Sequence, residues 1–323
     1  MRIVVTGSLA YDYIMNFPGH FKDHILPDKV HMLTVSFLVE SMRRLRGGVA
    51  GNIAYTLALL GERPLVVASA GGDFGEYRRW MEQKGIDASG ITEIEEDFTA
   101  SCFINTDESN NQIVAFYPGA MEEAKSLSLL DLGLSEDDLV VISPTDPEAM
   151  SRYADECRQL GVRFLFDPGK QTPRLDGEHI LAGLEGASVL IGNDYEFAMM
   201  AQKTGRGEEE LIGSVSLAVV TRGAEGSTIY TGDGEVEIPT APISDMIDPT
   251  GAGDAYIGGF VFGLARGFSL EVAGRVAALA GAYAIEHQGC QEHHYTPEEF
   301  AERYKGAFGP SPEIETLAEP AKR

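Results

Sequence analysis

The most informative segment of this 323-residue chain reads Asp248-Pro249-Thr250-Gly251-Ala252-Gly253-Asp254-Ala255-Tyr256. Its small residues precede a long apolar run and predict the start of a buried helix. The first N–H groups of a helix have no partner within it, and the helix dipole adds partial positive charge there, so an anion is favoured. The segment therefore predicts an anion site beside the carboxylate of Asp254, although a carboxylate at this position can also simply cap the helix.

Better-known phosphate-binding patterns are missing from the sequence. No Gly-x4-Gly-Lys-Ser/Thr loop occurs, and Tyr256 stands where a dinucleotide fingerprint needs its third glycine. Asp73-Phe74-Gly75 imitates a protein-kinase element, but no His-Arg-Asp loop accompanies it. These observations argue against a P-loop enzyme, a Rossmann dehydrogenase and a protein kinase.

The pattern around this segment predicts an α/β fold. From about residue 140, short apolar runs at 139–142, 164–166, 189–191 and 217–220 alternate with helical segments. Such alternation predicts a parallel sheet sandwiched by helices. In the first half, 31–39 and 99–117 have strand character without intervening helices. We predict one domain over 1–308, a small β-sheet lid formed by about 9–45 and 97–120, and a disordered tail at 309–323.

Composition limits the partners and the compartment. There are 25 basic and 50 acidic residues, a formal net charge of −25, so nucleic acid and anionic membrane surfaces would be repelled. The three widely spaced cysteines, Cys102, Cys157 and Cys290, suggest neither a disulfide framework nor a zinc site. No signal peptide or membrane-spanning run is recognisable. We expect a cytoplasmic protein with a small-molecule substrate and with neither nucleic acid nor a membrane as partner.

A second glycine-rich segment, Arg46-Gly47-Gly48-Val49-Ala50-Gly51-Asn52, precedes a predicted helix. The backbone at Gly47 and Gly48 can lie against a ligand, and the amide of Asn52 offers both a donor and an acceptor. Together, the two glycine segments resemble the two signatures of the ribokinase-like (PfkB) family of carbohydrate and nucleoside kinases. The resemblance extends from Gly7 to about Phe308 and is closest to adenosine kinases of the actinobacterial type.

The resemblance implies a ribokinase-like α/β fold and a kinase that transfers the γ-phosphoryl of ATP to the 5′-hydroxyl of adenosine. Asp254 would be the general base, and the N–H groups of Gly251, Ala252 and Gly253 would stabilise the transferred group. Asn193-Asp194-Tyr195-Glu196 resembles the family's magnesium element, so Asn193 and Glu196 would hold Mg²⁺ mostly through water. ATP would contact Asn193, Thr221, Gly223 and Gly226, and a monovalent cation such as K⁺ would bind near the loop after the last long helix.

The resemblance also implies an acceptor site. Asp12 would hold the ribose hydroxyls with Gly48 and Asn52 beside it. The other predicted contacts of the nucleoside are Ser8, Ser36 and Phe116 around the base, and Gln171 and Arg174 from the opposite side. Cys102 replaces a second aromatic residue of that kinase type, and strand alternation would point Phe103 to the other face of the lid. A homodimer formed through the lid is implied too.

Two other hypotheses remain open. The enzyme could be a sugar kinase of the same family, such as a ribokinase or fructokinase, or another nucleoside kinase, because Asp12 and Asn52 suit any polyol. It could also be a nucleoside sensor without turnover. Asp254 and the Asn193–Glu196 element argue against a sensor, since pure binding needs neither a base nor magnesium.

Overall fold

The computed structural model describes residues 1–25 and 27–318 and is built on a sheet of nine strands. The strand order is β13-β12-β11-β10-β9-β8-β1-β4-β5, and all strands run in one direction except β12, which is antiparallel to both β11 and β13. The strands are β1 (Ile3–Thr6), β4 (Leu65–Gly71), β5 (Asp87–Ile94), β8 (Leu139–Ile142), β9 (Arg163–Phe166), β10 (Val189–Asn193), β11 (Leu217–Thr221), β12 (Ser227–Thr231) and β13 (Gly234–Ile238).

Helices cover both faces of this sheet. One core cluster takes side chains from α1 (Val49–Leu59), α2 (Gly75–Gln83), α7 (Ala252–Ala265), α8 (Leu270–Ile285) and α9 (Pro297–Phe308). The other takes them from α3 (Pro147–Leu160), α4 (Gly177–Leu184), α5 (Asp194–Thr204) and α6 (Glu208–Ile212). Along β1, Ile3 and Val5 belong to the first cluster and Val4 to the second, as strand alternation requires. The predicted helix-sheet-helix sandwich is confirmed.

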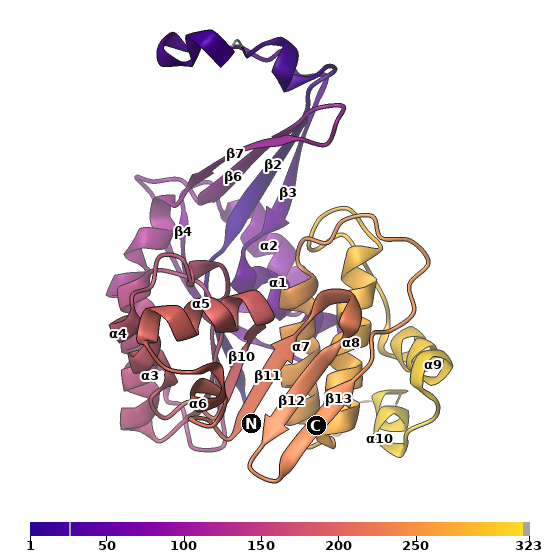
Figure 1. Cartoon of the computed structure of the whole chain (residues 1–323). Coiled ribbons are helices and arrows are strands. Elements are labelled where there is room, and N and C mark those ends of the chain that lie inside the picture. Colours follow the sequence, from indigo (N-terminus) through magenta and orange to yellow (C-terminus); the bar gives the residue numbers. More distant parts are fainter. Residues whose placement is uncertain (26, 319–323) are drawn as a thin grey trace.

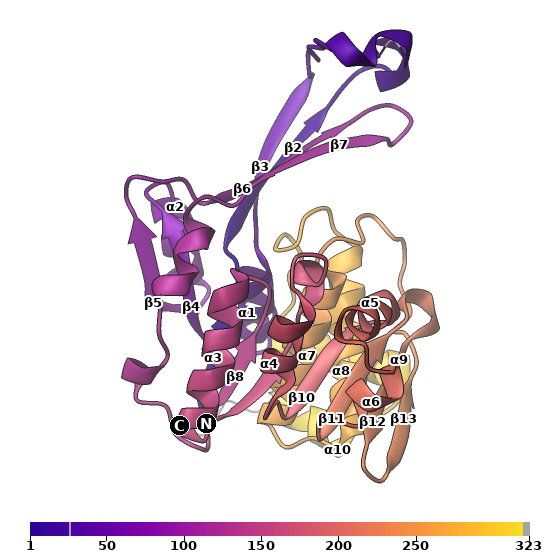
Figure 2. The ribbon, with the colours of Figure 1, turned by 60° about the vertical axis from the view of Figure 1, so that its left-hand side comes forward.

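A second sheet of four strands, in the order β3-β2-β6-β7, projects from one end of the main body (Figure 1). Its strands are β2 (Ala10–Asn16), β3 (Ser41–Gly47), β6 (Ala100–Thr106) and β7 (Gln112–Tyr117). Figure 2 shows the same projection after rotation, with the short 3-10 helices η1 (Phe21–Asp23) and η2 (Pro27–Met32) at its far end. We call this four-stranded sheet the lid.

One strand of the lid is shifted from its predicted position. The expected strand at 31–39 is wrong, because these residues form the end of η2 and an irregular segment, and β3 begins at Ser41. The pairing of β2 with β3 ends where Asn16 meets Ser41. Residues before Ser41 lie beyond the end of β2 and have no strand to pair with there.

The C-terminal segment corrects another expectation. Disorder was predicted for 309–323, but the structure contains α10 (Pro312–Glu315) and η7 (Thr316–Ala318), while 319–323 lie outside the described residues. Ile314 and Leu317 are three residues apart and are buried, as part of the core cluster that α9 shares with α7 and α8. Glu313 also accepts a hydrogen bond from the backbone N–H of Ser269 at 2.6 Å. Two apolar side chains and one polar contact therefore hold a segment whose composition alone suggests disorder.

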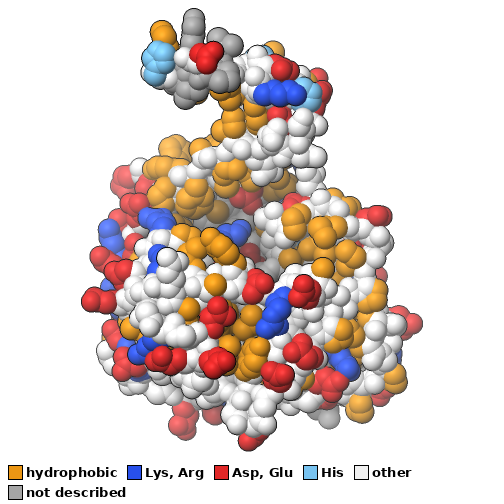
Figure 3. All heavy atoms as spheres, viewed as in Figure 1, with side chains coloured by type: hydrophobic (Ala, Val, Ile, Leu, Met, Phe, Trp, Pro, Cys, Tyr) orange, Lys and Arg blue, Asp and Glu red, His pale blue; other side chains and the backbone are white. Residues whose placement is uncertain are grey.

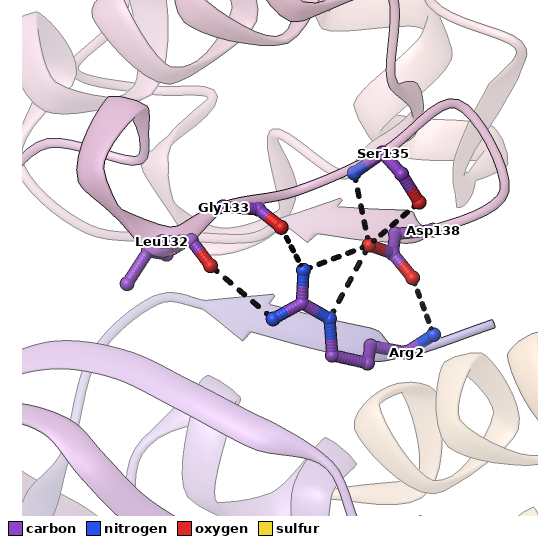
Figure 4. Close-up of polar contacts among 5 residues, drawn as sticks. All are labelled: Arg2, Leu132, Gly133, Ser135 and Asp138. Carbon is purple, nitrogen blue, oxygen red and sulfur yellow. Dashed lines mark hydrogen bonds and ion pairs between the residues drawn. The ribbon is translucent and has the colours of Figure 1, made fainter.

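The first strand is anchored by one carboxylate (Figure 4). Asp138, which precedes β8, accepts from the backbone N–H of Arg2 at 2.6 Å and from its guanidinium at 3.0 Å. The Arg2 guanidinium also donates to the carbonyls of Leu132 and Gly133, and Ser135 donates to Asp138 through its N–H and hydroxyl. Burial raises the pKa of Asp138, but the donors from Arg2 and Ser135 outweigh it and lower the pKa to about 2.

Among the described residues, no helix combines the length and apolar character needed to cross a bilayer.

Candidate active site

A cavity of about 380 Å³ lies at the carboxyl edge of the main sheet. It is bordered by residues that follow β9, β10 and β11 and by the start of α7, which is where open α/β sheets bind ligands. Figure 3 shows the surface hollowed between the lid and the main body. The polar side chains that line the cavity are Asp167, Lys170, Asn193, Glu196, Thr221, Thr250 and Asp254.

The backbone forms a tight turn just before α7, and contacts with the loop after α8 fix this turn. Gly251 has φ +83°, and a Cβ there would lie 2.9 Å from the side chain of Cys290. Asp248 accepts from the N–H of Thr250 at 3.0 Å and from the N–H of Gly289 at 3.1 Å, so it ties this turn to the loop after α8. The tight turn requires glycine at 251, because this backbone conformation and the sulfur of Cys290 both disfavour a side chain.

The predicted anion site is divided between two cavities. Gly251 and Gly253 line the 380 Å³ cavity. Ala252 lines a second cavity of about 340 Å³, and its N–H points toward the carbonyl of Pro249 at 3.4 Å. The N-terminus of α7 thus lies between the two spaces, where a ligand that occupied both would meet the positive end of the helix dipole.

Asp254 lies in the first turn of α7 and receives a hydrogen bond from another helix. Its Oδ2 accepts from Nδ2 of Asn52, in α1, at 2.7 Å. Burial raises the pKa of Asp254, while Lys170 and Asn52 oppose that rise. A carboxylate in this environment can accept a proton more readily than an exposed one, which suits a general base.

Asn193 and Glu196 form the start of α5. Oδ1 of Asn193 accepts from the N–H of Glu196, and Oε2 of Glu196 accepts from the N–H of Asn193, both at 2.8 Å. This capping box orients both side chains and places them in the cavity wall. The predicted magnesium element is thus also the structural start of a helix.

The carboxylates around this cavity repel one another. Burial raises the pKa of Asp167 well above its ordinary value, and Glu196 and Asp254 raise it further. In the part of the chain that the structure describes, no three His, Cys, Asp or Glu side chains are arranged to hold a metal ion by themselves. Asn193 and Glu196 offer amide and carboxylate oxygens, which are the kind of donor that Mg²⁺ takes beside its waters and the oxygens of phosphates.

The second cavity is mostly apolar. It is lined by small and aliphatic residues from α8 and from the segment after β13, and it contains the predicted nucleotide-binding residues Thr221, Gly223 and Gly226. Gly226 has φ +89° and closely approaches the backbone of Ile238. The two cavities share Thr221, Pro249, Gly253 and Tyr256. A ligand with an apolar ring and a polyanionic chain could therefore lie across both.

On the lid, three predicted or notable residues form one row. Asp12 lies opposite Cys102, which lies opposite Phe116, so all three share a face. Phe103 is on the other face, stacked on Tyr13 at 4.8 Å between ring centroids, as strand alternation predicts. Phe116 is thus the aromatic member of the row at this position, and Cys102 stands beside it.

Two members of the row, Asp12 and Cys102, lie near Lys170 of the cavity wall. Burial raises the pKa of Asp12 to about 6, with Lys170 opposing the rise and Asp248 and Asp254 contributing to it. The carboxylate of Asp12 also lies against Gly47, where a Cβ would come within 2.5 Å of its oxygen. Asp12 and Asp254 therefore belong to one electrostatic environment, although one is on the lid and the other on α7.

The other predicted acceptor residues have varied surroundings. Oγ of Ser8 accepts from the N–H of Val49 at 3.1 Å at the start of α1, and Gly48 has φ +89° and packs on the backbone of β2. The buried Gln171 donates to the carbonyl of Thr145 at 2.6 Å. Ser36 and Arg174 are exposed. None of the eight predicted acceptor residues is among the residues that line the two cavities: Ser8, Asp12, Ser36, Gly48, Asn52, Phe116, Gln171 and Arg174.

Sequence reasoning missed Asp167 and Lys170. Both follow β9, and both line the cavity. The ammonium of Lys170 interacts with the carboxylates of Asp254 and Asp12, which raise its pKa against the effect of burial. Both are polar residues just after a predicted parallel strand, and the tendency of α/β sheets to bind ligands at the carboxyl ends of their strands could have found them.

In this fold the positive end of α7 lies beside the carboxylate of Asp254, an arrangement that suits a kinase of small molecules. Residues 2–297 match the family model described as pfkB family carbohydrate kinase, and the chain belongs to that family. The predicted ribokinase-like fold and family are confirmed.

Relatives span nearly the whole chain. The nucleoside kinase of Methanocaldococcus jannaschii is 31% identical over 304 residues, covering 94% of this chain and 96% of that protein. The nucleoside kinase of Burkholderia thailandensis, solved with inosine, is 38% identical with a TM-score of 0.85, covering 95% of this chain and 98% of that one. Solved with ADP-inosine, it is 40% identical with a TM-score of 0.84, covering 96% and 97%. Ribokinase of Bacillus subtilis is 25% identical over 296 residues, covering 90% of this chain and 94% of that protein.

Proposed function

We propose that this protein is an ATP-dependent nucleoside kinase that phosphorylates the 5′-hydroxyl of adenosine to give AMP. The position of Asp254 carries this proposal: it is a buried carboxylate at the helix start where the two cavities meet, and it shares its environment with Asp12 of the lid. The nucleoside kinases of Methanocaldococcus jannaschii and Burkholderia thailandensis support a nucleoside as the acceptor.

In the proposed reaction, Asp254 accepts the proton of the 5′-hydroxyl as that oxygen attacks the γ-phosphorus in line. The N–H groups at residues 251–253 stabilise the charge on the transferred group, and the apolar cavity holds the adenine of ATP. Magnesium, when bound, would neutralise the phosphates, and Asn193 and Glu196 are the residues that would hold it. A monovalent cation near the loop after α8 stays a prediction.

The lid supplies the acceptor contacts in this proposal. Asp12 binds the ribose hydroxyls, with Asn52 and Gly48 beside it, and Phe116 stacks on the base. Closure of the lid over the ribose would exclude water that could otherwise accept the phosphoryl group. We propose that two copies of the chain associate through their lids.

The test is an ADP-release assay with adenosine, inosine, guanosine, ribose and fructose at equal concentrations, followed by identification of the product. We expect the highest kcat/KM with adenosine and a 5′-monophosphate as product. A higher value with inosine would keep a nucleoside kinase and replace adenosine as the preferred acceptor. A higher value with ribose or fructose would overturn the nucleoside assignment.

A sugar kinase is the second candidate, because one observation favours it. The row that would face the base holds Cys102 beside Phe116, so a base would stack on one aromatic ring there. Asp12 and Asn52 could bind the hydroxyls of a sugar without help from Phe116. The same assay separates the two candidates.

A further inference from the structure

A chain of buried hydrogen bonds leads from the root of the lid to Asp254. Nε2 of Gln291 donates to Oδ1 of Asn52 at 2.7 Å and to the hydroxyl of Tyr77 at 2.6 Å. The Tyr77 hydroxyl donates to the carbonyl of Gly47, the last residue of β3, at 3.0 Å. Asn52 in turn donates to Oδ2 of Asp254 at 2.7 Å. The members come from β3, α1, α2, α7 and the loop after α8.

The residues of this series of hydrogen bonds are buried, and a glycine makes room for them. Gln291, Tyr77 and Asn52 are 3%, 0% and 5% exposed. Gly51 lies one residue before Asn52, and a Cβ there would lie 2.9 Å from Nε2 of Gln291 and still closer to the hydroxyl of Tyr77. The missing side chain of Gly51 therefore makes room for the two groups that reach Asn52.

The donors and acceptors of this hydrogen-bond series allow only one orientation of the Asn52 amide. A carboxamide has an oxygen that only accepts and a nitrogen that only donates, and either end can face a neighbour. Because the Tyr77 hydroxyl donates to Gly47, it must accept from Gln291, so Nε2 of Gln291 faces both partners as a donor. The oxygen of Asn52 then faces Gln291, and its nitrogen is left for Asp254. A reversed amide would place its oxygen against the carboxylate, which repels it.

We propose that Gln291 and Tyr77 are positioning residues for phosphoryl transfer, which hold the Asn52 amide so that it donates to Oδ2 of Asp254 and leaves Oδ1 to accept the substrate proton. This inference rests on the proposed function, in which Asp254 is the base. Since Gly47 ends a lid strand, the same contacts fix the root of the lid relative to the base. Neither Gln291 nor Tyr77 lines the two cavities, so both act through Asn52.

The experiment compares Gln291→Met, which removes the amide but keeps the length of the side chain, with Gln291→Glu, which can only accept from Asn52. The matched control is Gln288→Met, in the same loop but exposed and paired with Arg43. We expect Gln291→Met to lower kcat roughly tenfold, with the KM for ATP within about twofold of wild type. In an Asn52→Ala background, Gln291→Met should have no further effect, because its partner is gone.

Gln291→Glu provides a second readout that needs no turnover. Its carboxylate would attract the nitrogen of Asn52 and turn the oxygen toward Asp254. The substitution should therefore raise the pKa of Asp254 more when Asn52 is present than in an Asn52→Ala background, where only the added charge acts, as followed by carbon NMR of the Asp254 carboxyl group. The other titratable groups that face Asp254 stay the same in every variant: Asp12, Asp167, Lys170, Glu196 and Cys290.

Independent effects of Gln291→Met and Asn52→Ala on kcat would overturn the positioning role, and so would an equal rise in the pKa of Asp254 on Gln291→Glu with and without Asn52. A loss of kcat in Gln288→Met equal to that in Gln291→Met would do the same, because it would show a general effect of the loop. If wild type phosphorylates none of the acceptors, the proposed function fails, whereas the titration still decides whether Gln291 orients Asn52.

Discussion

Asp254 is subject to opposing influences at the scale of single residues. Burial favours its protonated form, whereas Lys170 and the amide of Asn52 favour the carboxylate. The balance leaves a carboxyl group whose pKa is raised, which suits the general base that we propose. Asp254→Asn tests whether this residue accepts the proton, and Lys170→Met tests whether the neighbouring charge sets its pKa.

Replacing Asp254 by Asn keeps the volume and a hydrogen-bonding group but removes the proton acceptor. We expect kcat to fall by on the order of 10² to 10⁴, with the affinities for ATP and nucleoside little changed. Steady-state kinetics and calorimetry check this, with Asp233→Asn, in the exposed turn between β12 and β13, as the control. More than about a tenth of the wild-type rate in a folded Asp254→Asn variant would mean that another group is the base.

Lys170→Met removes the cation that lowers the pKa of both Asp254 and Asp12. The pKa of each carboxyl should therefore rise. Because Asp254 acts in its ionised form, the acidic limb of the kcat/KM profile should move to higher pH. The profile is measured beside that of Lys305→Met, an exposed lysine of α9. An unmoved acidic limb would show that Lys170 does not influence the base during turnover.

At the scale of elements, short strands depend on anchors outside the sheet. β1 has four residues and lies between β8 and β4. The contacts of Arg2 with Asp138 and the preceding turn join its start to the segment before β8. The ordinary pKa of an aspartate lies near 3.8 and that of Asp138 is about 2, so its contribution to stability is present above about pH 4 and is lost as the pH falls toward 2.

Asp138→Asn should lower the free energy of unfolding by about 1 to 3 kcal/mol at neutral pH, because buried donors lose a charged acceptor. The difference from wild type should shrink between about pH 4 and pH 2, where wild type also loses the charge. Denaturant unfolding at several pH values measures both effects, and the exposed neighbour Asp137→Asn is the matched control. Equal stability of Asp138→Asn and wild type at neutral pH would contradict the anchoring role.

Sequence patterns predicted helices and strands best where contacts within one turn determine the structure. The starts of α5 and α7 could be placed from their sequences, because capping residues and small residues act within one turn. Residues 31–39 have strand-like composition and form no strand, since a strand also needs a partner within reach. Residues 310–318 look unstructured by composition, yet Ile314 and Leu317 pack beside α9 into the core.

At the scale of the whole molecule, the face of the lid opposite Asp12 is rich in apolar side chains, although the exposed Arg44 also lies on it, opposite Tyr13. Phe103 lies on this face with Tyr13, Met15, Met42 and Ile113, and Met42, Phe103 and Ile113 are exposed. The outer strands β3 and β7 end the sheet. An apolar face and unpaired strand edges are both features that a second copy of the chain can cover.

Phe103→Glu should therefore convert a dimer into monomers, because a buried interface would have to accommodate a charge. Light scattering coupled to size-exclusion chromatography measures the mass, and circular dichroism checks the fold. Phe98→Glu is the control, since Phe98 is 66% exposed but lies outside the lid strands. A wild-type mass of one chain, or a dimer that persists in Phe103→Glu, would contradict association through this face.

The chemistry of the site could be read from the sequence wherever it depends on neighbours in the chain. The segments 46–52 and 248–256 specify tight turns and helix starts, and these features need only glycine, a helix dipole and a carboxylate one turn away. The succession of strands and helices along the chain follows from apolar periodicity, which also depends only on neighbouring residues. The family resemblance extended this to Asp12, Asn193 and Phe116.

What required the folded structure is the meeting of groups that are remote in sequence. Asn52 and Gln291 are 239 residues apart, and Lys170 approaches Asp12 and Asp254 through the packing of η5 (Gly169–Gln171) beside the lid and α7. No local pattern encodes such distances, because they depend on how parallel strands are ordered and how helices pack across them. Parallel strands bring their carboxyl ends to one edge, and that edge, with the helix that begins there, places these groups around a single cavity.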